Sequence, residues 1–147
     1  MYRFRNINFE FRDFKYYNPD DRFKKKELEL EFNFEISSEK KNHIDIFLHL
    51  KFSYPVENKY FELFHADYLA NFPSIKKNDF ENFDKQKLAH CLGISILMMK
   101  GAFYTSTQNS LLKDFVFPVL NPLDILEKKY PELKIVQTID LNSYADY

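Results

Sequence analysis

The only cysteine of the chain, Cys91, directly follows His90 in the stretch KLAHCLGISI at residues 87–96. A cysteine beside a histidine suggests either a nucleophile with its general base or two ligands of a metal ion. Neighbouring residues on a helix point about 100° apart, so this pair cannot readily face each other as base and nucleophile. The adjacency therefore argues against catalysis, and we interpret Cys91 as a small hydrophobic core residue.

A metal site is not indicated either. Zinc requires three or four ligands at suitable spacing, and the chain has no second cysteine. His43 and His49 are separated by six positions, and His65 stands alone. We expect His43 and His49 to share a solvated strand face with Asp45, and we predict neither a metal nor a cofactor.

Acidic residues and glycines offer no better case for an enzyme. Glu27, Glu29 and Glu31 alternate along one predicted strand, and such a row of like charges is typical of an exposed face protected against edge-to-edge pairing. Two glycines are too few for a phosphate-binding loop. No serine, histidine and aspartate occur in a recognisable nucleophile setting, so we expect a protein without catalytic activity.

The composition favours one domain with apolar surface to spare. The chain has 147 residues, a net charge of −1 and a pI near 6.4, which give no electrostatic footprint for nucleic acid. Its 17 phenylalanines and 10 tyrosines are more than a monomer of this size can readily cover, so we expect partners. A single cysteine and the lack of a continuous apolar stretch in MYRFRNINFEF indicate a cytoplasmic protein.

Four stretches alternate between apolar and polar residues with the period of a β-strand. They cover Phe4–Tyr17, Glu27–Ile36, residues 43–54 and residues 59–72, with turn residues NPDD, SSEKKN and PVEN between them. The fourth stretch is apolar on both sides, which predicts cover on both faces. We expect one row to contain Phe61, Leu63 and Leu69, and the opposite row to contain Phe64, Ala66, Tyr68 and Phe72.

The second half of the chain predicts helices. Asp84 is a plausible N-cap for a helix over 88–104 that is apolar almost all round, which predicts burial between its own sheet and a second subunit. We predict no membrane insertion, because His90 and Lys100 interrupt the apolar stretch. A short helix follows, with Asn121 as N-cap and Pro122 at its first position.

Two motifs carry a resemblance to a known family. The run AHCLG at residues 89–93 opens the long helix, and Phe117, Pro118, Leu120 and Asn121 form an FPxLN pattern before the short one. Together with four preceding strands and a crossover around Pro19, these motifs resemble SecB, the bacterial protein-export chaperone. The resemblance covers roughly residues 2–130, most specifically in the two motifs.

The resemblance implies an α+β protomer with a four-stranded antiparallel sheet and a long and a short helix packed on one face. The chaperone domain would span residues 1–131, followed by a C-terminal tail, 132–147, for which the sequence offers no firm account. SecB proteins are homotetramers, dimers of dimers, that hold unfolded polypeptides without ATP and pass them to SecA. The family's acidic SecA contact has a counterpart in Asp13, whereas its other acidic positions fall near Tyr17 and at Phe64.

The resemblance to SecB and the pattern of the long helix predict two sets of site residues. The predicted client-binding residues are Tyr16, Tyr17, Phe23, Leu123 and Leu126, each of which has ordinary core packing as its alternative. The predicted oligomer interface contains Ala89, Leu92, Gly93 and Ile96, where Ala89 and Gly93 would let another backbone approach. Two other functions stay open: a dedicated chaperone that holds the antitoxin of a toxin-antitoxin system, and an adaptor protein with no chaperone activity.

Overall fold

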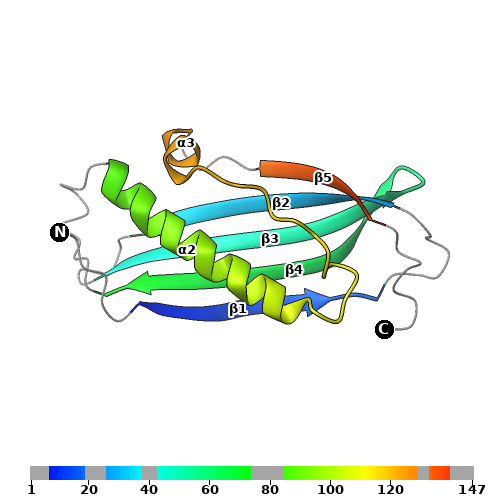
Figure 1. Ribbon diagram of the computed structural model, residues 1–147, viewed down its shortest axis with the longest axis horizontal. Helices are drawn as coiled ribbons and strands as arrows, with labels where there is room; N and C mark the ends of the chain where they lie inside the picture. Colours follow the sequence, from blue (N-terminus) through cyan, green and yellow to red (C-terminus); the bar gives the residue numbers. More distant parts are fainter. Residues whose placement is uncertain (1–6, 19–25, 38–42, 74–84, 129–132, 140–147) are drawn as a thin grey trace.

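The computed structural model describes residues 7–18, 26–37, 43–73, 85–128 and 133–139, so Phe23, Pro19 and Asp84 lie outside the described residues. The elements in chain order are β1 (Asn8–Tyr16), β2 (Lys26–Ser37), β3 (Ile44–Val56), β4 (Lys59–Phe72), α2 (Lys85–Ser106), α3 (Pro122–Glu127) and β5 (Leu133–Ile139). The strands form one antiparallel sheet in the order β1-β4-β3-β2-β5 (Figure 1). The α+β fold agrees with the prediction, but the sheet has five described strands instead of four.

The fifth strand lies in the stretch that we predicted as a tail. β5 runs antiparallel to β2, with register pairs from Lys26↔Ile139 to Phe32↔Leu133. It therefore occupies the sheet edge that β2 would otherwise present. The regular alternation of ELELEFNFEI predicted β2 closely, but gave no information about which segment would pair with its outer edge.

β3 and β4 form a hairpin with a two-residue turn. Glu57 and Asn58 both have positive φ angles, 48° and 66°, as a type I′ turn requires. Asparagine tolerates this conformation better than most residues because its short polar side chain can bond locally. The predicted turn at PVEN is thus confirmed and is confined to its last two residues.

A β-bulge at Leu63 changes which side chains of β4 face the core. Phe52 pairs with Phe64, whereas the next residue of β3 pairs with Glu62, so Leu63 is the extra residue. Beyond the bulge, Phe61 lies on the same face as Phe64. The predicted row that joined Phe61 to Leu63 was therefore wrong, because a bulge reverses the alternation on which that row depended.

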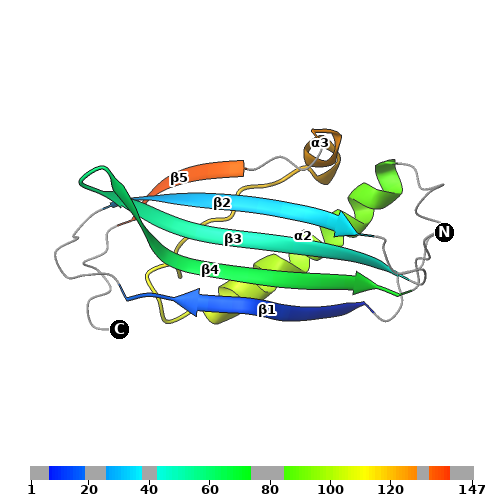
Figure 2. The same ribbon diagram turned by 180° about the vertical axis from the view of Figure 1, so that it is seen from behind.

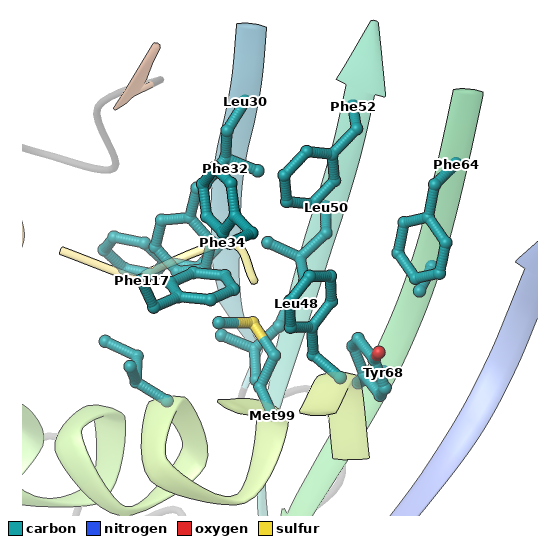
Figure 3. Close-up of a cluster of buried hydrophobic side chains, with 14 of the residues drawn as sticks. Leu30, Phe32, Phe34, Leu48, Leu50, Phe52, Phe64, Tyr68, Met99 and Phe117 are labelled. Atoms are coloured by element: carbon teal, nitrogen blue, oxygen red, sulfur yellow. The ribbon is translucent and has the colours of Figure 1, made fainter. Parts of the chain in front are cut away.

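The core lies between the sheet and α2, which crosses one face of the strands diagonally (Figure 1). The apolar rows of β2, β3 and β4 face the helix, and Figure 3 shows their side chains gathered beneath Met99 and Phe117. The fully buried members include Leu28, Leu30, Phe32, Phe34, Ile46, Leu48, Phe52, Phe64, Tyr68, Cys91, Leu92, Met99 and Phe103. The opposite face, turned to the viewer in Figure 2, carries no helix among the described residues, so cover on both faces of β4 stays a prediction.

Phe103 is the centre of an aromatic cluster. Its ring centroid lies 5.2–5.6 Å from those of Phe52, Phe64 and Phe117, with stacked or edge-to-face geometry. Such aromatic pairs contribute about 0.5–1.5 kcal/mol each beyond the area that they bury. The segment after α2 is therefore fixed on the sheet through Phe117, and this positions α3.

The short helix α3 begins as the sequence predicted. The Asn121 side chain accepts hydrogen bonds from the backbone N–H groups of Leu123 (3.0 Å) and Asp124 (3.4 Å), and Pro122 occupies the first turn. α3 packs against α2, and a Cβ atom built on Gly93 would lie 3.2 Å from Cγ of Pro122. Gly93 thus accommodates a proline of its own chain.

By length and composition, α2 is apolar enough to cross a membrane, and 39% of its most apolar window is buried inside the protein. The core helix of a protein that does not enter a membrane satisfies the same criterion. α2 places Leu92, Met99 and Phe103 in the core at 0% exposure, which is the arrangement of a core helix.

Candidate binding surfaces

The most exposed aromatic surface lies on β1, at the edge of the sheet. α2 packs on β3 and β4 and leaves the neighbouring side chains of β1 partly open. Phe11 is 50% exposed, Phe14 43% and Tyr17 36%. Phe11 and Phe14, with the half-buried Phe9 and Tyr16, form a surface that we call the aromatic strip, whereas Tyr17 contacts Lys15 on the opposite face of the sheet.

The aromatic strip rests on buried rings of β4. The centroids of Phe9 and Phe11 lie 5.4 and 5.1 Å from that of Tyr68, and Phe14 contacts Phe64 edge-to-face at 5.3 Å. Burial raises the pKa of the Tyr68 hydroxyl, which has no hydrogen-bond partner within the part of the chain that is described. The strip is therefore an exposed apolar surface on a rigid base.

Tyr16 ends the strip, and Tyr17 points to the opposite face of the sheet. The Tyr16 hydroxyl accepts a hydrogen bond from the backbone N–H of Leu111 at 3.5 Å, and burial raises its pKa. The backbone N–H of Tyr17 donates to the carbonyl of Leu63 at 2.8 Å, while the Lys15 ammonium lies 4.6 Å from the Tyr17 ring centroid. Tyr16 is thus anchored, whereas the Tyr17 ring remains available for contact.

The predicted client-binding residues do not form one site. Leu123 and Leu126 are half-buried on α3, near the end of β2, whereas Tyr16 and Tyr17 lie at the far end of β1 (Figure 1). Leu126 also packs against the core. Of the four predicted residues that the structure describes, only Tyr16 belongs to the aromatic strip.

A second apolar surface lies between the outer side of α2 and the segment before α3. It is a pocket of about 390 Å³ whose lining includes Ile94, Leu97, Val119 and Leu120. Leu97 is 68% exposed and Val119 96%. We call this the α2 pocket.

Three of the four predicted interface residues, Ala89, Gly93 and Ile96, line the α2 pocket, whereas Leu92 does not. Ala89, Leu92 and Ile96 are 8%, 0% and 3% exposed, so they are core residues of the single chain. A side chain with almost no exposed surface cannot contribute much area to a partner. The close approach that we predicted at Gly93 is made by Pro122 of the same chain.

Histidines and carboxylates cluster on the open face of the sheet, which the sequence described only as solvated. Nε2 of His65 lies 2.8 Å from Oδ2 of Asp13 on β1, and Nδ1 lies 2.5 Å from Oε1 of Glu62. Burial lowers the pKa of His65, but the hydrogen bonds and charges of the two carboxylates outweigh it and raise the pKa overall. His65 therefore joins β1 to β4 as a charged bridge.

Two further pairs lie on this face. His49 contacts Asp67 at 2.9 Å, and His43 contacts Asp45 at 3.4 Å. The carboxylates of Asp13 and Glu62 contact different ring nitrogens of His65. They therefore do not converge on one point, as metal ligands must. Among the described residues, no three His, Cys, Asp or Glu side chains are placed to hold a metal ion.

The interpretation of Cys91 as a core residue is confirmed. Its side chain is completely buried, and burial raises the pKa of the thiol to about 12. A thiol with such a pKa is almost entirely protonated near neutral pH and is a poor nucleophile. His90, the neighbouring residue, is exposed on the other side of α2.

Comparisons with protein-family models, curated proteins and solved structures find no match to this chain. The two motifs that resemble SecB have structural roles here: Cys91, Leu92 and Phe117 are buried, and Asn121 caps α3. They explain how the helices are placed and do not by themselves identify a binding site.

Proposed function

We propose that the chain is an ATP-independent holdase chaperone and a divergent member of the SecB family. It binds unfolded or aggregation-prone polypeptides in the cytoplasm and keeps them ready for protein export. It uses no cofactor and catalyses no reaction. A homotetramer is the expected assembly, as the family resemblance implies.

The aromatic strip is the observation that supports this proposal most strongly. Phe11 and Phe14 expose half or nearly half of their surface while their rings rest on buried rings of β4. Broad apolar surfaces bind through buried area and so tolerate many sequences, as a holdase requires. Tyr16 extends the same surface.

The α2 pocket is the proposed contact between subunits. Leu97 and Val119 are exposed apolar side chains at this pocket. Contact with a second copy of the chain would remove their apolar surface from water. The contact would use these residues in place of the predicted Leu92 and Ile96, which are already buried. A native mass measurement gives the number of subunits.

A dedicated antitoxin chaperone is the second candidate. The acidic position that the resemblance assigns to SecA docking falls at Phe64, which is completely buried, and Asp13 is bonded to His65. Both features favour a chaperone that acts without SecA. An adaptor protein with the same fold is the third reading, and it would not prevent aggregation.

The test is suppression of aggregation of chemically unfolded rhodanese, followed by light scattering without nucleotide. We expect suppression at near-stoichiometric amounts of protein, and a clear loss of it in Phe11→Ser and Phe14→Ser. Tyr60→Ser is the matched control, because Tyr60 is an exposed aromatic residue (65%) on the β3–β4 hairpin, away from the strip. Absence of suppression by the wild-type protein would favour the adaptor.

A further inference from the structure

β5 is the outer strand of the sheet and pairs with β2 along its whole length. Its extensive contacts are with β2 alone. Among its described side chains, Ile139 is 8% exposed and therefore buried, whereas Val136 is 61% exposed. An edge strand that pairs on one side only is drawn from the less stable part of a fold.

One polar group of β5 is badly placed. The side-chain oxygen of Gln137 is buried and has no hydrogen-bond partner among the described residues. Gln137 pairs in register with Leu28, a fully buried residue. Burying an amide oxygen without a hydrogen-bond partner is unfavourable, so this position weakens the attachment of β5.

The edge beneath β5 suits an extended polypeptide. Leu28, Leu30 and Phe32 of β2 are completely buried, and the backbone groups on the outer side of β2 pair with β5. If β5 moves away, β2 presents a row of unpaired N–H and C=O groups beside apolar side chains. Such an edge binds an added strand through backbone hydrogen bonds, which depend little on sequence.

We propose that β5 is an intramolecular occupant of a strand-binding site on β2, and that an extended apolar segment of an unfolded client replaces it. This inference rests on the proposed holdase function and names the site for one class of client segment. The preferred segment carries an apolar residue opposite Leu28, where Gln137 now lies. Such a residue removes the unpartnered oxygen, so the client gains an interaction that β5 lacks.

The proposal makes client affinity depend on how tightly β5 is held. When only a fraction of molecules is open, the apparent dissociation constant rises in inverse proportion to that fraction. Gln137→Leu stabilises β5 and should weaken client binding. Val136→Pro removes a backbone donor from β5 and should strengthen it.

The decisive experiment locks β5 with a disulfide in the full chain. Glu27 and Thr138 are register partners on β2 and β5 with exposed side chains, so Glu27→Cys with Thr138→Cys places two thiols across the pair. The matched control is Glu31→Cys with Lys51→Cys, which joins β2 to β3, two strands that stay paired in the proposal. Cys91 is buried and does not compete.

Binding is measured by fluorescence anisotropy with two labelled probes, reduced and carboxymethylated α-lactalbumin and a peptide of the β5 sequence LKIVQTI. We expect oxidation of the β2–β5 lock to weaken both probes by at least about tenfold, because the open fraction becomes negligible. Reductant should restore binding, and the β2–β3 control should bind equally in both redox states. If the disulfide fails to form, Gln137→Leu and Val136→Pro provide the same comparison in opposite directions.

Two results would overturn the inference. If the oxidised lock binds α-lactalbumin as tightly as the reduced form does, clients use another surface, and the holdase function stands without this site. If the lock blocks the β5 peptide but α-lactalbumin binds no form of the protein, the edge opens but has no unfolded client. In that case the proposed holdase function fails, and the inference fails with it.

Discussion

The two outer strands of the sheet, β1 and β5, are attached in different ways. β1 pairs with β4 along its whole length, stacks aromatic side chains on Tyr68 and Phe64, and is bridged by His65 on the opposite face. β5 buries Ile139 but also an unpartnered oxygen of Gln137. The difference indicates that β1 presents a fixed surface, whereas β5 covers a surface that can be uncovered.

Removing the support of β1 should have the largest effect. Phe64 is completely buried and contacts Phe14, Phe52 and Phe103, so Phe64→Ala should destabilise the fold by about 3–5 kcal/mol. Urea denaturation followed by circular dichroism measures this change. Phe61→Ala is the control, with a much smaller loss expected because Phe61 is 44% exposed. Equal losses would mean that β1 is not supported from the core.

Amide hydrogen exchange compares the two edges directly. We expect the amides of β5 to exchange about ten to a hundred times faster than those that pair β1 with β4, because β5 buries an unpartnered oxygen at Gln137 whereas β1 stacks its rings on Tyr68 and Phe64. Exchange measured by NMR at one pH gives the protection of each amide. Equal protection of the two strands would remove the contrast between a fixed and a removable edge.

The His65 bridge should make the attachment of β1 depend on pH. The carboxylates of Asp13 and Glu62 raise the pKa of His65 in the folded protein despite the opposing effect of burial. The bridge therefore stabilises the fold fully below the unfolded pKa of about 6.5, and this contribution disappears as pH rises through the higher folded value.

His65→Gln should accordingly cost about 1 kcal/mol near pH 6 and less near pH 9, as expected for one partly exposed charged bridge. Urea denaturation at a series of pH values measures the loss of stability at each pH. His90→Gln serves as the control, because His90 is exposed on α2, on the other side of the sheet. A loss for His65→Gln that is constant between pH 6 and 9 would show that the bridge does not titrate.

The sequence predicted the features that depend on neighbouring residues. The alternation from Glu27 to Ile36 identified β2 almost to its ends, and Asn121 with Pro122 located the start of α3. Both signals are local: a period of two along a half-buried strand, and a side chain that bonds the N–H groups of the next turn.

The features that depend on distant pairing were missed. The bulge at Leu63 follows from the register between β3 and β4, and it moved Phe61 to the core face. The bridge between Asp13 and His65 exists because β1 pairs with β4, far along the chain. β5 was described only as an apolar tail, because a short edge strand is specified by the edge that it covers.

Photo-crosslinking tests the central claim, that the aromatic strip holds unfolded polypeptide, most directly. Benzoylphenylalanine is placed at Phe11 in one protein and at Tyr60 in another, two exposed aromatic positions at different sites. Each protein is irradiated with reduced and carboxymethylated α-lactalbumin, and the adducts are quantified by mass spectrometry. We predict strong crosslinks from position 11 and few from position 60. No adducts at position 11, or equal amounts at both positions, would contradict the account.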